Sequence, residues 1–239
     1  MGAAPRRALD PRPWLVLPAR LLLFAGFQAL FALALGGWAA SAAWWPVFGA
    51  LANVATIALL VALVRREGAS FRSLLAFDVA RRSGDLTRLP FVAVVAGLLA
   101  YLPNVWVAAW LYGSADVPLD AFLGPLPVWA VVAAIAFPLT IMFAELPLYF
   151  GYAMPRLEAQ TGRAWPAVVL PALFLAAQHV TLPLVLDARF LFWRLLMFLP
   201  FALFLGVVLR RRPSLMAYVI VLHGLLDAAV LPLLWARAV

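Results

Sequence analysis

Long apolar runs separated by short polar connections dominate the chain. A helix needs about 20 apolar residues to cross the hydrocarbon core of a bilayer, and seven runs satisfy or approach this length. They lie near residues 20–42, 45–64, 90–112, 127–154, 166–186, 190–209 and 214–235. The pattern therefore predicts an all-α fold, a polytopic transmembrane helical bundle of about seven spans.

The fourth run is long and carries two prolines, Pro138 and Pro147. Proline removes a backbone donor and clashes with the preceding turn, so we expect this span to be tilted or kinked, with neighbouring helices satisfying the freed carbonyls. The alternative is a break at Pro138 into a surface piece and a shorter crossing.

Composition supports the same fold class. Of the 239 residues, 67% are hydrophobic and the mean hydropathy is +1.03, well above the apolar content of soluble domains. No internal repeat or linker divides the chain, so a single integral-membrane domain over residues 1–239 is predicted. The absence of Cys excludes disulfides, thiolate metal ligands and cysteine nucleophiles.

All 18 basic residues are Arg, which indicates a nucleotide-composition bias in the source. The net charge of +8 would suggest nucleic acid for a soluble protein, but the arginines cluster between apolar runs, so the bilayer is the expected partner and nucleic acid is not. One set would share a side of the membrane: Arg6, Arg7, Arg12, Arg65, Arg66, Arg72, Arg81, Arg82, Arg88, Arg156, Arg163, Arg210, Arg211 and Arg212. The positive-inside rule then predicts a cytoplasmic N-terminus. The composition suggests a bacterial source, so a bacterial cytoplasmic (inner) membrane is expected.

Residues 65–89 form the one sizeable polar connection. Phe71, Leu74, Leu75 and Phe77 lie there beside arginines, which is typical of an amphipathic helix on an anionic leaflet. A solvated loop is the other interpretation.

Four ionisable residues fall well inside the predicted spans: Glu145, His179, His223 and Asp227. A rise of about 1.5 Å per residue places all four at depths of about 14 to 21 Å. His223 and Asp227 are four residues apart and therefore share one helix face. We expect the four side chains to meet inside the bundle.

Charged groups at this depth are costly, so a functional site is the default interpretation. A desolvated Glu145 suits general-base catalysis, with imidazole donors for a developing oxyanion. The same four residues are candidate ligands for a divalent metal such as zinc, although no His-Glu-x-x-His motif occurs, and the sequence leaves the cofactor open. A neutral hydrogen-bonded network that locks the helices, or a proton relay in a transporter, would use the same residue types.

Residues 127–235 resemble the catalytic core of the CPBP family of intramembrane metalloproteases, the CAAX prenyl endopeptidase and bacteriocin-processing (Abi) group. That family carries Glu-Glu-x-x-x-Arg followed by Gly-Tyr-Leu-x-Pro-Arg-Leu, then Phe-x-x-x-His, then His-x-x-x-Asn or Asp. The second motif corresponds to LFLAAQH, with His179 in place and the Phe displaced to Phe174, and the third is HGLLD, with His223 and Asp227. The first motif matches at Glu145, Gly151, Tyr152, Pro155, Arg156, Leu157 and Glu158.

Two positions of the first motif differ, because its second Glu is Leu146 and its Arg is Phe150. The resemblance implies that Glu145 activates a water molecule while His179, His223 and Asp227 assist and stabilise the oxyanion. It implies an endopeptidase acting on a peptide or membrane-protein substrate. The two departures leave a second interpretation, a catalytically inactive membrane scaffold or binding protein of the same fold, and a proton-coupled transporter is a third.

Overall fold

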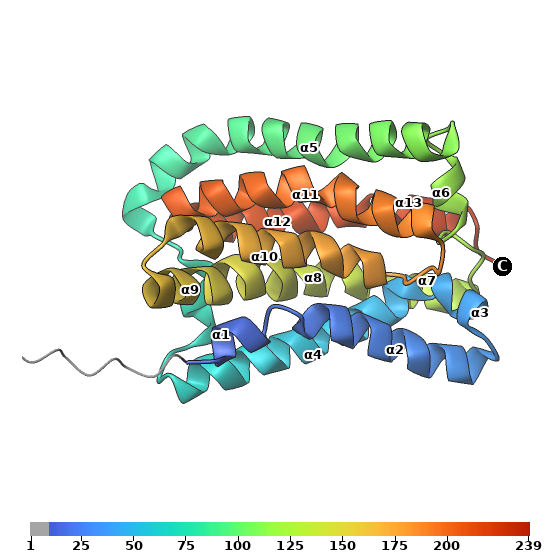
Figure 1. The fold of residues 1–239 in the computed structure, drawn as a ribbon, viewed down its shortest axis with the longest axis horizontal. Helices are drawn as coiled ribbons and strands as arrows, with labels where there is room; N and C mark the ends of the chain where they lie inside the picture. The colour runs from blue at the N-terminus through green and yellow to red at the C-terminus, as the bar shows by residue number, and fades with distance from the viewer. Residues whose placement is uncertain (1–9) are drawn as a thin grey trace, which may run out of the picture.

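The chain folds into a bundle of helices that lie side by side along one direction (Figure 1). The computed structural model describes residues 10–239, and this range contains no β-strand. The α-helices are α1 (Arg12–Leu15), α2 (Ala19–Leu35), α3 (Trp38–Ala42), α4 (Trp45–Arg66), α5 (Arg82–Tyr112), α6 (Val117–Asp120), α7 (Val128–Ala134), α8 (Ala136–Leu146), α9 (Met154–Thr161), α10 (Ala164–Gln178), α11 (Ala188–Arg211), α12 (Met216–Ala228) and α13 (Leu231–Trp235). Short 3₁₀ or π segments are η1 (Phe71–Leu75), η2 (Val79–Arg81), η3 (Pro147–Ala153), η4 (His179–Thr181) and η5 (Pro213–Leu215).

Six helical segments among the described residues are long and apolar enough to cross a membrane, and α2 is a shorter apolar helix of 17 residues. Together they correspond to the seven predicted spans, so the all-α polytopic bundle is confirmed and the protein is an integral membrane protein. The first span is interrupted earlier than predicted. Gly36 adopts a left-handed conformation with φ +77°, which ends α2, and α3 restarts at Trp38.

The fourth predicted span is the structural centre of the bundle, and it is helical from Val128 to Thr161 with changes of geometry along its length. It consists of α7, α8, the π-helix η3 and α9, and α8 packs against both α4 and α12. The change to π-helix begins at Pro147, which lacks the N–H that an α-helix would use there. The predicted irregularity is therefore present at Pro147 as a π segment, while near Pro138 a turn at Ile135 separates α7 from α8 without dividing the span.

The polar connection differs from the amphipathic helix that its sequence suggests. It forms the two short 3₁₀ segments η1 and η2, and α5 begins directly afterwards at Arg82. Leu74 in η1 is buried against the π-helix, where a Cβ on Gly151 would lie 2.8 Å from the Leu74 carbonyl oxygen. The connection thus folds onto the bundle, and Gly151 is needed for that close approach.

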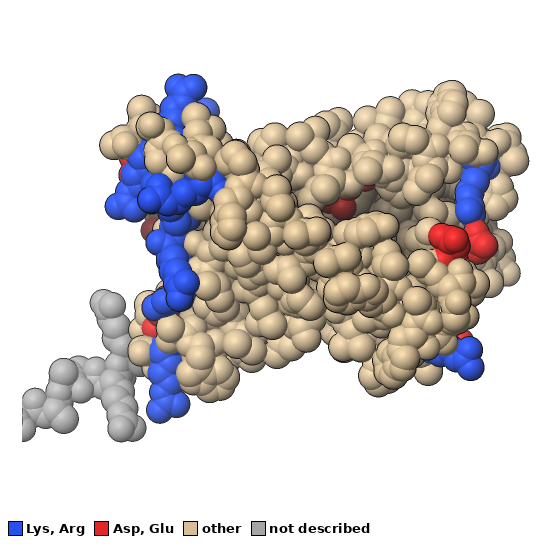
Figure 2. All heavy atoms as spheres, turned by 90° about the horizontal axis from the view of Figure 1, so that it is seen from above, with Lys and Arg blue, Asp and Glu red and all other residues tan. Residues whose placement is uncertain are grey.

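Arginines gather at one end of the bundle (Figure 2). This end carries the connection between α4 and α5 and the chain after α11, while the middle of the visible face is uncharged apart from a recessed acidic patch. The opposite end has few charges, including the Arg237–Asp120 ion pair at 2.9 Å. The unequal distribution of arginines between the two ends, from which the orientation was predicted, is therefore present. That the arginine-rich end faces the cytoplasm stays a prediction. Arg6 and Arg7 lie outside the described residues.

Candidate functional site

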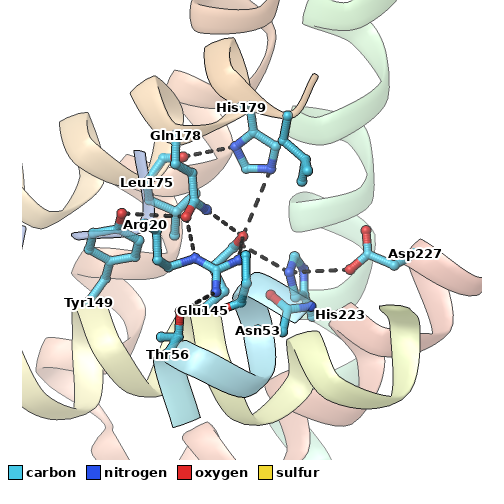
Figure 3. A network of polar contacts seen from close by, with 12 residues as sticks. Arg20, Asn53, Thr56, Glu145, Tyr149, Leu175, Gln178, His179, His223 and Asp227 are labelled. Atoms are coloured by element: carbon cyan, nitrogen blue, oxygen red, sulfur yellow. Dashed lines mark hydrogen bonds and ion pairs between the residues drawn. The ribbon is translucent and has the colours of Figure 1, made fainter. Parts of the chain in front are cut away.

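Glu145 lies in the last turn of α8, immediately before the π-helix, and its side chain is fully buried. Its Oε1 is 3.1 Å from His223 Nε2, and its Oε2 is 3.9 Å from His179 Nε2. Oε2 also accepts a hydrogen bond from Gln178 and is 3.7 Å from an Arg20 guanidinium nitrogen. Side chains from three other parts of the chain therefore converge on one carboxylate (Figure 3).

His223 lies between two carboxylates because of its position on α12. Asp227, one turn further along the same helix, places its Oδ2 3.4 Å from His223 Nε2. The close packing of α12 on α8 brings this pair to Glu145: a Cβ on Gly224 would lie 2.4 Å from Met142 Cγ. A residue without a side chain at this position lets the two helices approach closely.

His179 is oriented by contacts on both sides of its ring. Its Nδ1 lies 2.8 Å from the carbonyl oxygen of Leu175, and its ring stacks on Phe198 with centroids 3.6 Å apart. The backbone is also held, since Arg194 Nε donates a hydrogen bond of 3.0 Å to the His179 carbonyl oxygen. The side chain is thus fixed with Nε2 towards Glu145.

These contacts assign different tautomers to the two histidines. A carbonyl oxygen only accepts hydrogen bonds, so Nδ1 of His179 carries the proton and Nε2 of the neutral ring has a lone pair. His223 Nε2 lies 3.1 Å from Glu145 Oε1 and 3.4 Å from Asp227 Oδ2 without hydrogen-bond geometry to either, and a proton on Nε2 is the state that avoids placing its lone pair against two carboxylates that only accept. One imidazole presents an acceptor and the other a donor.

The four residues singled out from the sequence therefore lie together, and their catalytic role stays a prediction. The structure adds residues that the sequence did not indicate, above all Arg20 and Gln178, both fully buried at Glu145. Arg20 stands at the start of the first apolar run, and an arginine at the end of a span ordinarily extends to the membrane interface, so its position in the sequence did not indicate an interior site. Gln178 precedes His179 and carries no charge, so a list of ionisable residues omits it.

The two residues that differ from the family motif are apolar, and the residues around them are apolar too. Leu146 and Phe150 are 0% and 3% exposed and belong to the same apolar core cluster. Both side chains are apolar, so neither can offer Glu145 a charge or a hydrogen bond. The partners of Glu145 are instead supplied by other helices.

A divalent metal does not fit the arrangement as it stands. No group of three or more His, Cys, Asp and Glu residues within residues 10–239 is placed to hold a metal ion. The Arg20 guanidinium also lies beside Glu145 Oε2, where its positive charge opposes a second cation. We therefore derive no chemical step through a metal.

A cavity of about 530 Å³ adjoins the site between α5, α11 and α12. His223 and Asp227 line it together with Asn104, and most of the remaining lining is apolar. Its rim includes Tyr101 and Leu226, which are 63% and 51% exposed on the outer surface of the bundle. The cavity therefore connects the polar centre with the apolar surface.

Comparison with known proteins gives one finding. A family model described as type II CAAX prenyl endopeptidase Rce1-like matches residues 127–229. No curated protein and no solved structure matches. The match lies within the predicted core of residues 127–235, contains all four predicted site residues and confirms the resemblance inferred from the motifs. Residues 127–229 are therefore similar to the type II CAAX prenyl endopeptidase Rce1-like family.

Proposed function

We propose that the protein is an intramembrane endopeptidase that hydrolyses peptide bonds with a water molecule activated by Glu145. The observation that carries this proposal is the buried carboxylate flanked by two differently protonated imidazoles, with His223 Nε2 3.1 Å from Oε1 and His179 Nε2 3.9 Å from Oε2. Peptide hydrolysis needs a proton acceptor for water and a donor for the oxyanion. Both are available at one carboxylate.

In the proposed reaction, Glu145 accepts a proton from a water molecule whose orientation is fixed by the lone pair of His179 Nε2. The water oxygen attacks the peptide carbonyl carbon, and the carbonyl oxygen becomes an oxyanion. The Nε2–H of His223, oriented by Asp227, donates a hydrogen bond to that oxyanion. The C–N bond then breaks and Glu145 returns its proton to the leaving amine.

We propose a peptide or membrane-protein segment as substrate. The cavity of about 530 Å³ supports this, because its mostly apolar lining suits an apolar chain and His223 and Asp227 line one part of it. A substrate entering between α5 and α12 would thus meet the proposed oxyanion donor.

A catalytically inactive scaffold is the second candidate. The observation that favours it is the burial of Leu146 and Phe150 in an apolar cluster at positions where the family motif has a Glu and an Arg. In such a protein the contacts of Glu145 hold the helices together and serve no reaction.

One comparison separates these two functions. Wild type, Glu145→Gln and His223→Ala are purified in detergent or liposomes and tested against a quenched peptide library and a membrane-protein extract. Arg210→Gln, which breaks the surface ion pair of Arg210 with Glu158 at 2.7 Å, is the matched control. Cleavage by wild type and the control, but not by the two folded site variants, supports the peptidase. Absence of cleavage together with loss of thermal stability in the site variants supports the scaffold.

A further inference from the structure

A buried arginine from outside the family-matched region faces the proposed general base. Arg20 is fully buried near the start of α2, and one of its terminal guanidinium nitrogens lies 3.7 Å from Glu145 Oε2. The match to the family begins at residue 127, so this charge comes from a part of the chain that lies outside the match.

The guanidinium is held on several sides. Its Nε donates a hydrogen bond to Gln178 Oε1, one terminal nitrogen lies 3.4 Å from Thr56 Oγ1, and its centre is 4.7 Å from the Phe24 ring centroid. The nitrogen nearest Glu145 has no hydrogen-bond partner. A buried guanidinium is costly unless it is paired, and Glu145 is the carboxylate with which Arg20 forms an ion pair among the described residues.

Arg20 also determines which way the Gln178 amide points. Because Arg20 Nε is a donor, it requires the amide oxygen on its side, and this leaves the Gln178 NH₂ group directed at Glu145 Oε2 (Figure 3). Glu145 accepts from the other end of the amide, so the arginine and the carboxylate hold one orientation together, and without the arginine the amide oxygen keeps only the Tyr149 hydroxyl at 3.4 Å. Each hydrogen bond in this series is donated towards Glu145, first from Arg20 to Gln178 and then from Gln178 to the carboxylate.

We propose that Arg20 is a positioning residue for Glu145, balancing its charge and fixing the Gln178 donor that holds Oε2 in place. It thereby supplies, from α2, the positive charge that the family motif places at position 150, where this chain has an apolar Phe150. The inference rests on the proposed function, and it makes the N-terminal helices part of the site.

The first test is the kinetics of Arg20→Met and Arg20→Lys in liposomes. We expect Arg20→Met to lower kcat by about 10- to 100-fold with little change in KM, because the variant disturbs the group that orients the base. Arg20→Lys keeps the positive charge but lacks the planar guanidinium, so its kcat is expected to lie between that of the wild type and that of Arg20→Met. The exposed Arg210→Met is the matched control and should keep the wild-type kcat.

Wild-type kcat in Arg20→Met, or equal kcat in Arg20→Lys and Arg20→Met, would overturn the inference. Where Arg20→Met does not fold, Arg20→Lys is compared with wild type. A reduced kcat at unchanged KM supports the positioning role, and a complete loss equal to that of folded Glu145→Gln contradicts it.

A second readout needs no activity. Thermal stability is measured for Arg20→Lys, Glu145→Gln and the double variant, and we expect the double variant to be more stable than the sum of the single effects predicts. If the stability effects of the two substitutions are coupled but the wild type cleaves no substrate, the proposed function fails and Arg20 is only a structural partner of Glu145. Additive effects with an active wild type mean that the inference alone fails.

Discussion

Replacing Gly224 by Ala tests the packing that brings His223 to Glu145. The added Cβ would lie 2.4 Å from Met142 Cγ, 2.6 Å from Met142 Sδ and 3.0 Å from the Pro138 carbonyl oxygen. The methionine side chain can move, but the backbone oxygen requires α12 to shift by a few tenths of an ångström. His223 precedes this glycine, so the shift changes its 3.1 Å distance from Glu145.

The expected magnitude is the difference between two effects. Overpacking a filled core costs about 1–3 kcal/mol, and replacing Gly by Ala inside a helix returns about 1 kcal/mol. We therefore expect a net loss of about 1 kcal/mol in the free energy of unfolding, together with a fall in kcat. Unfolding in mixed detergent micelles and peptide cleavage measure the two effects.

Two further variants make this prediction specific. Gly26→Ala in α2 is the matched control, because a Cβ there has no atom within 4 Å, and it should be neutral or stabilising. Met142→Ala combined with Gly224→Ala removes the atoms in closest conflict and should recover part of the activity. The reasoning is refuted if Gly224→Ala is as stable and as active as Gly26→Ala.

Three other predictions concern the motif departures, the arginine-rich end and the cavity. Leu146→Glu places an unpaired carboxylate in an apolar cluster, so we expect a loss of about 3 kcal/mol or more in unfolding experiments and no gain in activity; higher activity in a stable variant would contradict this. The hydrogen bond from Arg156 holds the pKa of Glu67 below its ordinary range, so the pair stabilises the protein at neutral pH and this contribution is lost as the pH falls through the lowered pKa. Glu67→Gln should therefore flatten the fall in thermal stability between about pH 5 and pH 3, and an unchanged slope would argue against the pair. Gly97→Trp should fill the cavity and lower kcat/KM for a membrane-protein substrate without loss of folding, and unchanged cleavage would exclude this route.

Hydropathy predicts the spans well because the cost of exposing backbone and polar groups to lipid depends on segment length and composition. It does not predict how each segment is divided. The break after Gly36, the π-helix from Pro147 and the end of α10 at Gln178 depend on local backbone geometry and on neighbouring helices. The η1 segment packs against the bundle where Leu74 contacts Gly151, and hydropathy does not predict such a contact between distant parts of the chain.

The candidate site was predictable as far as depth and helical spacing allow. Glu145, His179, His223 and Asp227 share a depth, and two of them share a helix face, so their convergence follows from the sequence. Depth does not give the direction in which a side chain points around its helix. Arg20 therefore gave no sign that it lies at Glu145, because this contact depends on how α2 packs against α10.

The most direct test of the central claim is the mass of the products that wild type and Glu145→Gln form from one cleaved substrate in H₂¹⁸O. The account predicts a single cut by wild type, with one ¹⁸O atom in the new carboxylate, and no product from Glu145→Gln that remains folded. Cleavage by folded Glu145→Gln at the wild-type rate would contradict the assignment of Glu145 as the base.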